Sequence, residues 1–305
     1  MLIKRGDKSL NVKHLQQKLH LKEDGMFGRD TEKAVIKYQL SNNLAVTGIV
    51  ESEMWVLLFN KPYTDDWGID EDTDGEDQYY TTNYDQIIHK YFLPKDEYIN
   101  GPIKNEYIFL HHTAGWHNPY KTIDSWGRDT RGRIATEFVL GGRDHRNGED
   151  KYDGVMVQAF PEGGQGWHLG RTHSGWMNRH SVGLEMCSFG YLTSDNKTYT
   201  GSEVAAKEVF KLKEEFKGHL KYHKYSEKQL KETEKWIRYI GERDGIDVRI
   251  GLKQFIQKHG PTKGFGFHME AAQGKVKGLL THTNVRLDKS DCYPDPDFVD
   301  MILSL

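Results

Sequence analysis

Two adjacent histidines, His111 and His112, follow a short aromatic and branched run, Tyr107 to Leu110. Such a run is typical of a buried strand. Side chains alternate between the two faces of a strand, so both imidazoles cannot face one point. One of them is therefore available to a site at the end of the strand. A neutral imidazole there is a good zinc ligand, and a catalytic zinc site needs two further protein ligands.

A second apolar run, Leu279 to Thr281, also ends in a histidine, His282. The loop that follows contains a carboxylate, Asp291, and a thiol, Cys292. Two histidines with one carboxylate or thiolate leave a fourth position for water, as in hydrolytic zinc sites. The chain has 15 histidines, so the spacing also allows purely structural roles. The residues alone do not choose between Asp291 and Cys292.

Three stretches resemble the zinc-dependent N-acetylmuramoyl-L-alanine amidases of type 2: FLHHTAG at 109–115, SVGLE at 181–185 and LLTHTNVRLDKSD at 279–291. They occur in that family's order, over roughly residues 86–305, with an unmatched middle. The resemblance implies one bound zinc ion and hydrolysis of the amide between N-acetylmuramic acid and L-alanine in peptidoglycan.

The resemblance assigns His111, His282 and Asp291 as the metal ligands. The family usually ends its last motif with Lys-x-Asp-Pro or Lys-x-Cys-Pro, whereas this chain reads Lys289-Ser290-Asp291-Cys292-Tyr293-Pro294. The offset from Lys289 favours Asp291. Because no proline follows Asp291 directly, Cys292 stays as the alternative ligand.

Glu185 interrupts an otherwise apolar predicted strand, Ser181 to Met186. Burial would raise the pKa of such a carboxylate toward the value that suits a general base. The resemblance assigns proton transfer to Glu185 and stabilisation of an oxyanion to Lys289. Glu137 lies on another predicted strand and competes for the first role, which leaves its own role open.

The stretch Gly166 to Gly170 also resembles the family, in which its histidine lies beside the cleft. We therefore expect His168 to bind substrate and Trp167 to pack beneath it, with a plain core position as the alternative for Trp167. Thr113, directly after the histidine pair, is a further candidate for substrate binding. Alternatively, His112 or Thr113 fixes the orientation of the His111 ring through a hydrogen bond.

The segment from residue 86 mixes strand-like and helix-like runs. We predict strands at 107–110, 134–140, 154–160, 181–186 and at the run ending in His282, a helix at 84–93, and a loop with a short helix within 116–130. This mixture indicates an α/β catalytic domain, with a mixed central sheet flanked by helices.

Residues 1–60 are predicted to form a separate all-α unit. Apolar residues recur at helical spacing in three runs, separated by glycine-containing turns at Gly25 and Gly48. The unit resembles the small three-helical peptidoglycan-binding domain, notably in Asp24-Gly25-Met26-Phe27-Gly28 and Thr47-Gly48-Ile49-Val50. The resemblance implies an anchor to the cell wall.

Two further segments differ in composition. Residues 61–85 are acidic and poor in aliphatic side chains, which indicates a solvated linker before the catalytic domain at 86–305. A calcium-binding loop is the alternative, but the segment does not have the order of ligands that such a loop requires. Residues 202–260 contain lysine-rich runs in which Val204, Val209, Leu212 and Phe216 keep helical spacing. We therefore predict a helical insertion at about 202–260, with charge pairs on its solvated face.

Composition limits the partners. The net charge is -3, and the features of a nucleic-acid-binding surface are absent from the sequence. Two cysteines form no disulfide framework, and no run has the length of a signal peptide or a membrane span. We expect a monomer that is made in the host cytoplasm and reaches the cell wall after the membrane is breached, as a bacteriolytic phage endolysin does.

These observations predict a two-domain cell-wall hydrolase that binds peptidoglycan through both domains. Two alternatives stay open at this point. The first is a peptidoglycan-binding protein without activity on the same scaffold. The second is a glycosidase that uses Glu137 and Glu185 as paired carboxylates.

Overall fold

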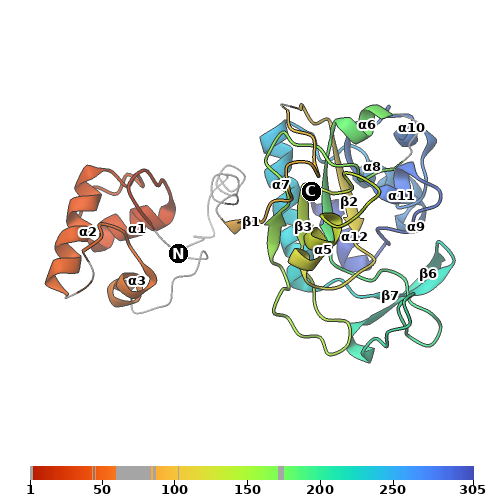
Figure 1. Ribbon diagram of the computed structural model, residues 1–305, viewed down its shortest axis with the longest axis horizontal. Coiled ribbons are helices and arrows are strands. Elements are labelled where there is room, and N and C mark those ends of the chain that lie inside the picture. Colours follow the sequence, from red (N-terminus) through yellow and green to blue (C-terminus); the bar gives the residue numbers. More distant parts are fainter. Residues whose placement is uncertain are drawn as a thin grey trace. The chain divides into compact units, whose positions relative to one another are not determined.

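The computed structural model describes residues 3–42, 44, 46–59, 84, 87–101, 103–170 and 175–305. The chain divides into two compact units, residues 1–76 and 77–305, and Figure 1 shows the elements of each. Apart from Tyr84, the predicted acidic linker at 61–85 lies outside the described residues.

The N-terminal unit is helical, as predicted. It contains α1 (Leu10–Lys18), α2 (Arg29–Ser41) and α3 (Ser52–Phe59). Ser9 caps α1 by accepting a hydrogen bond from the backbone N–H of Val12. The apolar stripes meet in a small core that includes Ile3, Val12, Leu15, Phe27, Val35, Val50, Met54, Trp55 and Phe59.

Two buried glutamines hold the turns of this unit. Gln16 donates to Asp24 and to the Met26 carbonyl, and it accepts from the backbone N–H of Gly25 at 2.8 Å. Gln39 accepts from the N–H of Gly48 at 2.9 Å. Both glycines have φ near +70°, a conformation that other residues adopt at a cost. Each turn thus lies nine residues after the glutamine that satisfies its backbone.

The C-terminal unit is built on a six-stranded mixed sheet in the order β1-β4-β3-β5-β2-β8. The strands are β1 (His89–Lys90), β2 (Tyr107–His112), β3 (Phe138–Leu140), β4 (Met156–Gln158), β5 (Ser181–Met186) and β8 (Gly278–Thr281). Strand β2 pairs in parallel with β5 on one side and with β8 on the other. The carboxyl ends of these three strands therefore meet at one edge of the sheet.

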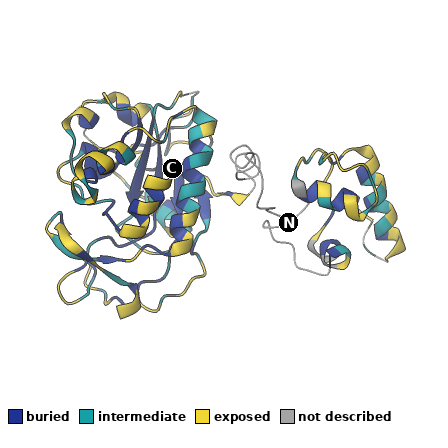
Figure 2. Cartoon of the chain, turned by 180° about the vertical axis from the view of Figure 1, so that it is seen from behind, coloured by how far each residue is buried: buried dark blue, intermediate teal, exposed yellow. Residues whose placement is uncertain are grey.

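Helices cover the sheet on both faces, which confirms the predicted architecture (Figure 1). One face packs against α7 (Glu227–Asp244), α8 (Leu252–His259) and α12 (Pro296–Ser304). Toward the other face lie α5 (Pro119–Trp126), α10 (Met269–Ala272) and α11 (His282–Val285). The short helices α6 (Gly175–Arg179) and α9 (Pro261–Gly264) complete the unit. Figure 2 shows buried residues along the strands and exposed residues on the outer sides of the helices.

The predicted helical insertion at 202–260 is wrong in its first half. Residues 209–223 form a two-stranded antiparallel hairpin of β6 (Val209–Phe216) and β7 (His219–His223). Apart from a short 3-10 turn at Ala206–Glu208, only the following α7 and α8 are helical. A spacing of four residues between Leu212 and Phe216 also places both side chains on one face of a strand. The turn at Lys217 and Gly218, with φ of +52° and +80°, supplies the reversal.

Other predicted elements were longer than those in the structure. The predicted helix at 84–93 gives way to β1 at His89 and Lys90, while the strands expected at 134–140 and 154–160 shrink to three residues each. The predicted short helix within 116–130 is α5. None of the described helices is long and apolar enough to cross a membrane.

Candidate functional site

The site lies where β2, β5 and β8 end. His111 is near the end of β2, and Glu185 is its direct register partner on β5. His282 is the first residue of α11, immediately after β8, rather than the last residue of a strand. Asp291 lies on the loop after α11, and its backbone carbonyl accepts a hydrogen bond from the backbone N–H of Thr283 at 3.2 Å. The sheet register thus brings together residues that are far apart in sequence.

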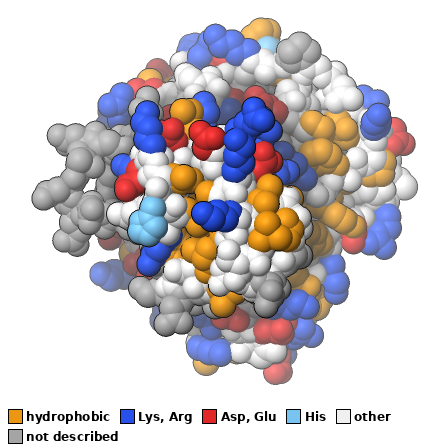
Figure 3. Space-filling model, turned by 90° about the vertical axis from the view of Figure 1, so that its left-hand side faces the viewer, with side chains coloured by type: hydrophobic (Ala, Val, Ile, Leu, Met, Phe, Trp, Pro, Cys, Tyr) orange, Lys and Arg blue, Asp and Glu red, His pale blue; other side chains and the backbone are white. Residues whose placement is uncertain are grey.

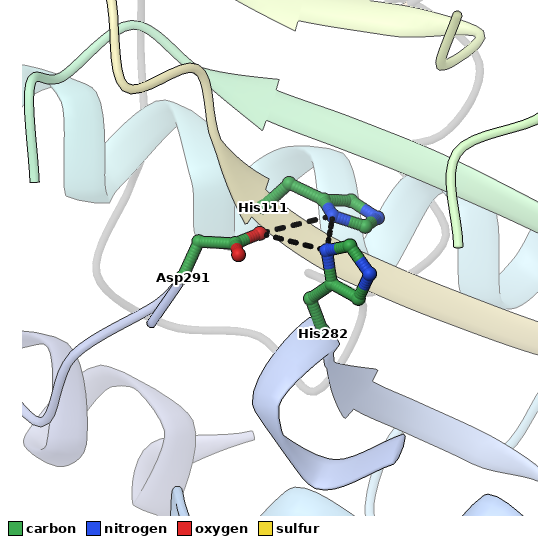
Figure 4. A group of neighbouring side chains, drawn as sticks. All are labelled: His111, His282 and Asp291. Atoms are coloured by element: carbon green, nitrogen blue, oxygen red, sulfur yellow. Dashed lines mark hydrogen bonds and ion pairs between the residues drawn. The ribbon is translucent and has the colours of Figure 1, made fainter. Parts of the chain in front are cut away.

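Three side-chain atoms form a nearly equilateral triangle (Figure 4). The Nδ1 atoms of His111 and His282 are 3.1 Å apart, and they lie 3.2 Å and 3.1 Å from Oδ2 of Asp291. Two tetrahedral zinc ligands, each about 2 Å from the ion, are separated by roughly 3.3 Å. Both histidines are buried, and Asp291 is half-buried. The spacing and the ligand types fit a zinc-sized cation.

The outer nitrogen of each imidazole, Nε2, has a hydrogen-bond partner outside the triangle. On His111, Nε2 forms a hydrogen bond with Nδ1 of His168 at 2.9 Å, and Nε2 of His168 forms one with Oγ of Ser181 at 2.8 Å. On His282, Nε2 donates to the carbonyl of Leu169 at 3.3 Å. When Nε2 of a neutral imidazole carries the proton, its Nδ1 atom presents a lone pair, and hydrogen bonds to Nε2 orient rings in this way at metal sites.

The charges of these groups fit a cation as well. Burial lowers the pKa of His111 to about 4, which keeps the ring neutral near pH 7. Burial alone would raise the pKa of Asp291, but His282 and His111 hold that pKa well below its usual range. A neutral His111 ring and the ionised Asp291 carboxylate therefore converge.

The second histidine of the pair, His112, points to the opposite face of the sheet, as the strand pattern predicts. Its Nδ1 lies 2.9 Å from the hydroxyl of Tyr225. A Cβ atom at Gly190 would approach Nε2 of His112 to 2.3 Å, so only glycine leaves room for this ring. His112 therefore belongs to the core beneath the site rather than to the triangle.

Asp291 and Cys292 have different surroundings. Asp291 is the only one of the two in the ligand group, while Cys292 is fully buried in the apolar cluster next to Tyr225. Burial raises the pKa of the Cys292 thiol well above its ordinary value, which disfavours the thiolate that a metal requires. The geometry therefore favours Asp291 over the alternative ligand.

Glu185 lies beside the triangle in an apolar setting. Burial, and to a smaller extent the Asp291 carboxylate, raises the pKa of Glu185 well above its ordinary value, and Lys289 opposes the shift. Its Oε2 atom is buried without a hydrogen-bond partner. A buried carboxylate with an unused oxygen beside a metal-type ligand group can take and return a proton at neutral pH.

Lys289 is half-buried on the same loop as Asp291, close enough to influence the pKa of both His111 and Glu185. Arg286 fixes the start of this loop. It donates to the carbonyl of Leu169 at 2.9 Å and pairs with Asp288 at 2.6 Å. Arg286 therefore shares the Leu169 carbonyl with His282, a link that no sequence motif indicated.

His168, predicted to bind substrate, contacts the ligand His111 instead. Both of its ring nitrogens are engaged, with His111 and Ser181 as partners. Gly183 of β5 allows the ring to lie close to the sheet, since a Cβ there would come within 3.1 Å of Nδ1 of His168. Asn178 of α6 binds the backbone N–H of His168 at 3.2 Å. The His168 ring thus supports His111, and its contact with substrate stays a prediction.

The other two predicted substrate-binding residues are both accessible to solvent to some extent, since Thr113 is half-buried and Trp167 is exposed. Trp167 is 36% exposed, so it is not the plain core residue of the alternative interpretation. The hydroxyl of Thr113 accepts from the backbone N–H groups of Gly115 and Ser188, at 3.1 Å and 3.3 Å. Thr113 therefore ties the ends of β2 and β5 together, and its binding to substrate stays a prediction.

Glu137 is not free for chemistry. Its carboxylate is 3% exposed and pairs with Arg243 of α7 at 2.9 Å and 3.3 Å, while Gln158 donates to it at 3.0 Å. Helix α7 packs on the sheet face opposite to His111. The role left open for Glu137 is therefore structural in this fold.

Comparisons with known proteins agree with this architecture. The sequence profile described as "N-acetylmuramoyl-L-alanine amidase" matches residues 100–276, and the profile described as "putative peptidoglycan binding domain" matches residues 8–58. The first match ends before His282 and Asp291, so the sheet register, not the profile, brings these two to the site.

Several solved structures are similar in outline. The catalytic domain of XlyA is 13% identical, with 71% of this chain and 97% of that chain covered and a TM-score of 0.40. The endolysin N-acetylmuramoyl-L-alanine amidase LysCS from Clostridium intestinale URNW is 14% identical, with 71% and 93% covered and a TM-score of 0.38. PlyL is 13% identical, with 67% and 85% covered and a TM-score of 0.38.

Proposed function

The chain belongs to the N-acetylmuramoyl-L-alanine amidase family, and we propose that it hydrolyses the amide between N-acetylmuramic acid and the L-alanine of the stem peptide by a zinc-assisted attack of water. It is a modular peptidoglycan amidase with an N-terminal peptidoglycan-binding unit. The observation that carries the proposal is the triangle of His111, His282 and Asp291 beside the half-buried Glu185, whose Oε2 atom is buried without a hydrogen-bond partner.

His111, His282 and Asp291 would hold the zinc ion, because their facing atoms all lie within 4.8 Å of one another and present lone pairs. When bound, the ion would polarise the scissile carbonyl and lower the pKa of water. His168 and the Leu169 carbonyl would keep the two imidazoles in the required tautomer.

Glu185 would accept the proton of the attacking water and return it to the leaving amine. Its raised pKa suits both steps, since a carboxylate with an ordinary pKa would be a weaker base toward water and would hold almost no proton near pH 7. Lys289 would stabilise the oxyanion of the tetrahedral intermediate from the loop that also carries Asp291. Trp167 and Thr113 would contact the substrate at the rim.

The N-terminal unit would hold the enzyme on the wall, so that tethering raises the local concentration of substrate. Basic, acidic and apolar side chains are mixed on the face seen in Figure 3. Over the described residues, this face lacks the single-sign basic patch that nucleic-acid binding requires (Figure 3). We propose the role of an endolysin that acts on the host wall at lysis, with murein as the partner of both units.

Mass spectrometry of digested murein tests the bond. An amidase releases stem peptides with a free L-alanine amino group and leaves glycan strands without peptides, whereas a glycosidase produces new reducing ends. Binding to murein without any product would indicate the inactive alternative. The pairing of Glu137 with Arg243 speaks against a glycosidase with two free carboxylates.

Glu185→Gln tests the proposed proton transfer. We expect the variant to keep its zinc content, measured by elemental analysis, and to lose roughly 10²- to 10⁴-fold in kcat. Glu162→Gln, at an exposed position, is the matched control and should behave like the wild type. If Glu185→Gln retains the wild-type rate, Glu185 has no part in the mechanism.

A further inference from the structure

The hairpin β6–β7 contacts both ends of the loop that carries Lys289 and Asp291. At the hairpin's tip, Nζ of Lys217 donates to the carbonyl of Leu287 at 3.1 Å, across 70 residues of sequence. The Leu287 side chain is 69% exposed, so this end of the loop has little apolar packing to fix it. The tip of the hairpin is therefore hydrogen-bonded directly to the loop just before Lys289.

The base of the hairpin holds the other end of the loop. The ring of Tyr293, two residues after Asp291, stacks on Tyr222 at 4.1 Å and on Tyr225 at 4.6 Å between ring centroids. Its hydroxyl donates to the carbonyl of His223 at 3.2 Å. Tyr293 is completely buried in this stack. The short loop between Leu287 and Tyr293 is thus attached to the hairpin at both ends.

The hairpin itself is anchored well enough to act as a support. Leu212, Phe216 and Tyr222 are buried in the main core of the unit. The hydroxyl of Thr262 on α9 donates to Glu214 at 3.1 Å. Packed side chains and a cross-link to a helix restrict local motion of a strand pair. The hairpin is the region at the edge of the C-terminal unit in Figure 1.

Lys217 adopts a backbone conformation that places it at this contact. Its φ is +52°, in the left-handed region that residues with a side chain rarely adopt. The following residue is Gly218, also at positive φ. The side chain is half-buried, and Asp288 and Asp291 are its electrostatic neighbours. The amine thus lies among the groups of the loop.

We propose that Lys217 is a positioning residue, through which the hairpin holds the loop 287–291 so that Lys289 and Asp291 are in place before substrate binds. The catalytic part of this inference rests on the proposed function. Misplacement of a catalytic group by about 1 Å can lower a rate by as much as 10²-fold. The expected signature is a loss in kcat and in metal affinity, with KM little changed.

The test compares Lys217→Met, Lys217→Arg and the control Lys213→Met in the full chain. Lys213 is exposed on β6 and therefore controls for loss of one positive charge from the same hairpin. Hydrogen exchange of the amides at 287–291 is measured on the metal-free protein. Zinc affinity is measured by competition with a chromophoric chelator, and kcat and KM are measured on a soluble muropeptide.

We expect Lys217→Met to speed amide exchange in the loop about tenfold, to weaken zinc binding severalfold and to lower kcat roughly tenfold. Lys217→Arg, which keeps a donor for the Leu287 carbonyl, should restore most of each loss. Lys213→Met should match the wild type.

Equal exchange in Lys217→Met and Lys213→Met would overturn the proposal. A rise in KM alone would overturn it as well, because Lys217 would then bind substrate. If the wild type cuts a bond other than the amide, the proposed function fails. Exchange and zinc affinity would still decide the role of Lys217.

Discussion

Replacing Arg243 with methionine should expose the energetic cost of the buried carboxylate of Glu137. Arg243 donates two hydrogen bonds to Glu137, at 2.9 Å and 3.3 Å, and two to Asp244. The Glu137 side chain is 3% exposed, and after the substitution only Gln158 would still donate to it. Removing one partner of a buried ion pair costs about 3–5 kcal/mol.

The loss should depend on pH, and its sign follows from the pKa of Glu137. Burial raises this pKa, and Arg243 opposes the shift, so the substitution raises it further. Between the unfolded value, about 4.3, and the raised folded value, the native state binds more protons than the unfolded state. Stability of the variant therefore falls by about 1.4 kcal/mol per pH unit as pH rises through this window.

These numbers give an expected difference between two conditions. At pH 5 protonation of Glu137 costs only about 1 kcal/mol, so Arg243→Met should lose little stability. At pH 8 the loss should approach the full 3–5 kcal/mol. The double variant Glu137→Gln/Arg243→Met carries no buried charge at position 137 and should recover most of the loss at pH 8. About 1 kcal/mol should remain lost, because Asp244 then keeps only the hydrogen bond from Asn105.

Urea unfolding followed by circular dichroism at pH 5 and pH 8, with chelator present to remove metal linkage, measures these energies. Murein digestion by Glu137→Gln is measured in parallel and should match the wild type. The reasoning is refuted if Arg243→Met is within 1 kcal/mol of the wild type at pH 8. It is also refuted if Glu137→Gln folds normally but loses hydrolysis, which would restore Glu137 as a catalytic candidate.

Three further outcomes are expected. Burial lowers the pKa of His223 to about 3, so this residue takes up a proton in the unfolded chain before it does so in the folded protein as pH falls below 6.5. The variant His223→Asn should therefore lose less stability between pH 6.5 and 4, by up to about 1.4 kcal/mol per pH unit in urea titrations. An unchanged slope of stability against pH would contradict this. Asp291→Ala should lower zinc content while Cys292→Ala keeps it, and the reverse result would reassign the ligand. Gln16→Ala should unfold the N-terminal unit and abolish sedimentation with murein, yet leave kcat on a soluble muropeptide unchanged; retained sedimentation would show that the Gln16 hydrogen bonds are dispensable.

Much of the candidate site could be read from the chain because the chemistry is local to short motifs. His111 and Glu185 each sit in a strand whose alternation is visible in the sequence, and the structure pairs them directly across β2 and β5. The same alternation correctly separated His111 from His112. The helices of the N-terminal unit follow from apolar spacing and glycine turns in the same way.

The errors arose where spacing was ambiguous or where a partner came from a distant element. A four-residue repeat fits one face of a helix and one face of a strand equally well, so the hairpin at 209–223 was mistaken for a helix. No local pattern could show that Glu137 meets Arg243 across 106 residues, or that His168 binds the ring of His111 across 57. Such contacts depend on which elements pack together.

The order of residues along this chain therefore predicted the fold class, the residue types that meet at the candidate site and Glu185 as a candidate for proton transfer. Tertiary structure decided which nitrogen of each imidazole faces the metal position, which of two neighbouring residues joins the ligand group, and what holds the final loop in place. The physical reason is the distance along the chain over which each kind of interaction acts. Alternation and turn preferences act over a few residues, whereas the orientation of a ring or a loop depends on hydrogen bonds and packing between elements far apart in the chain.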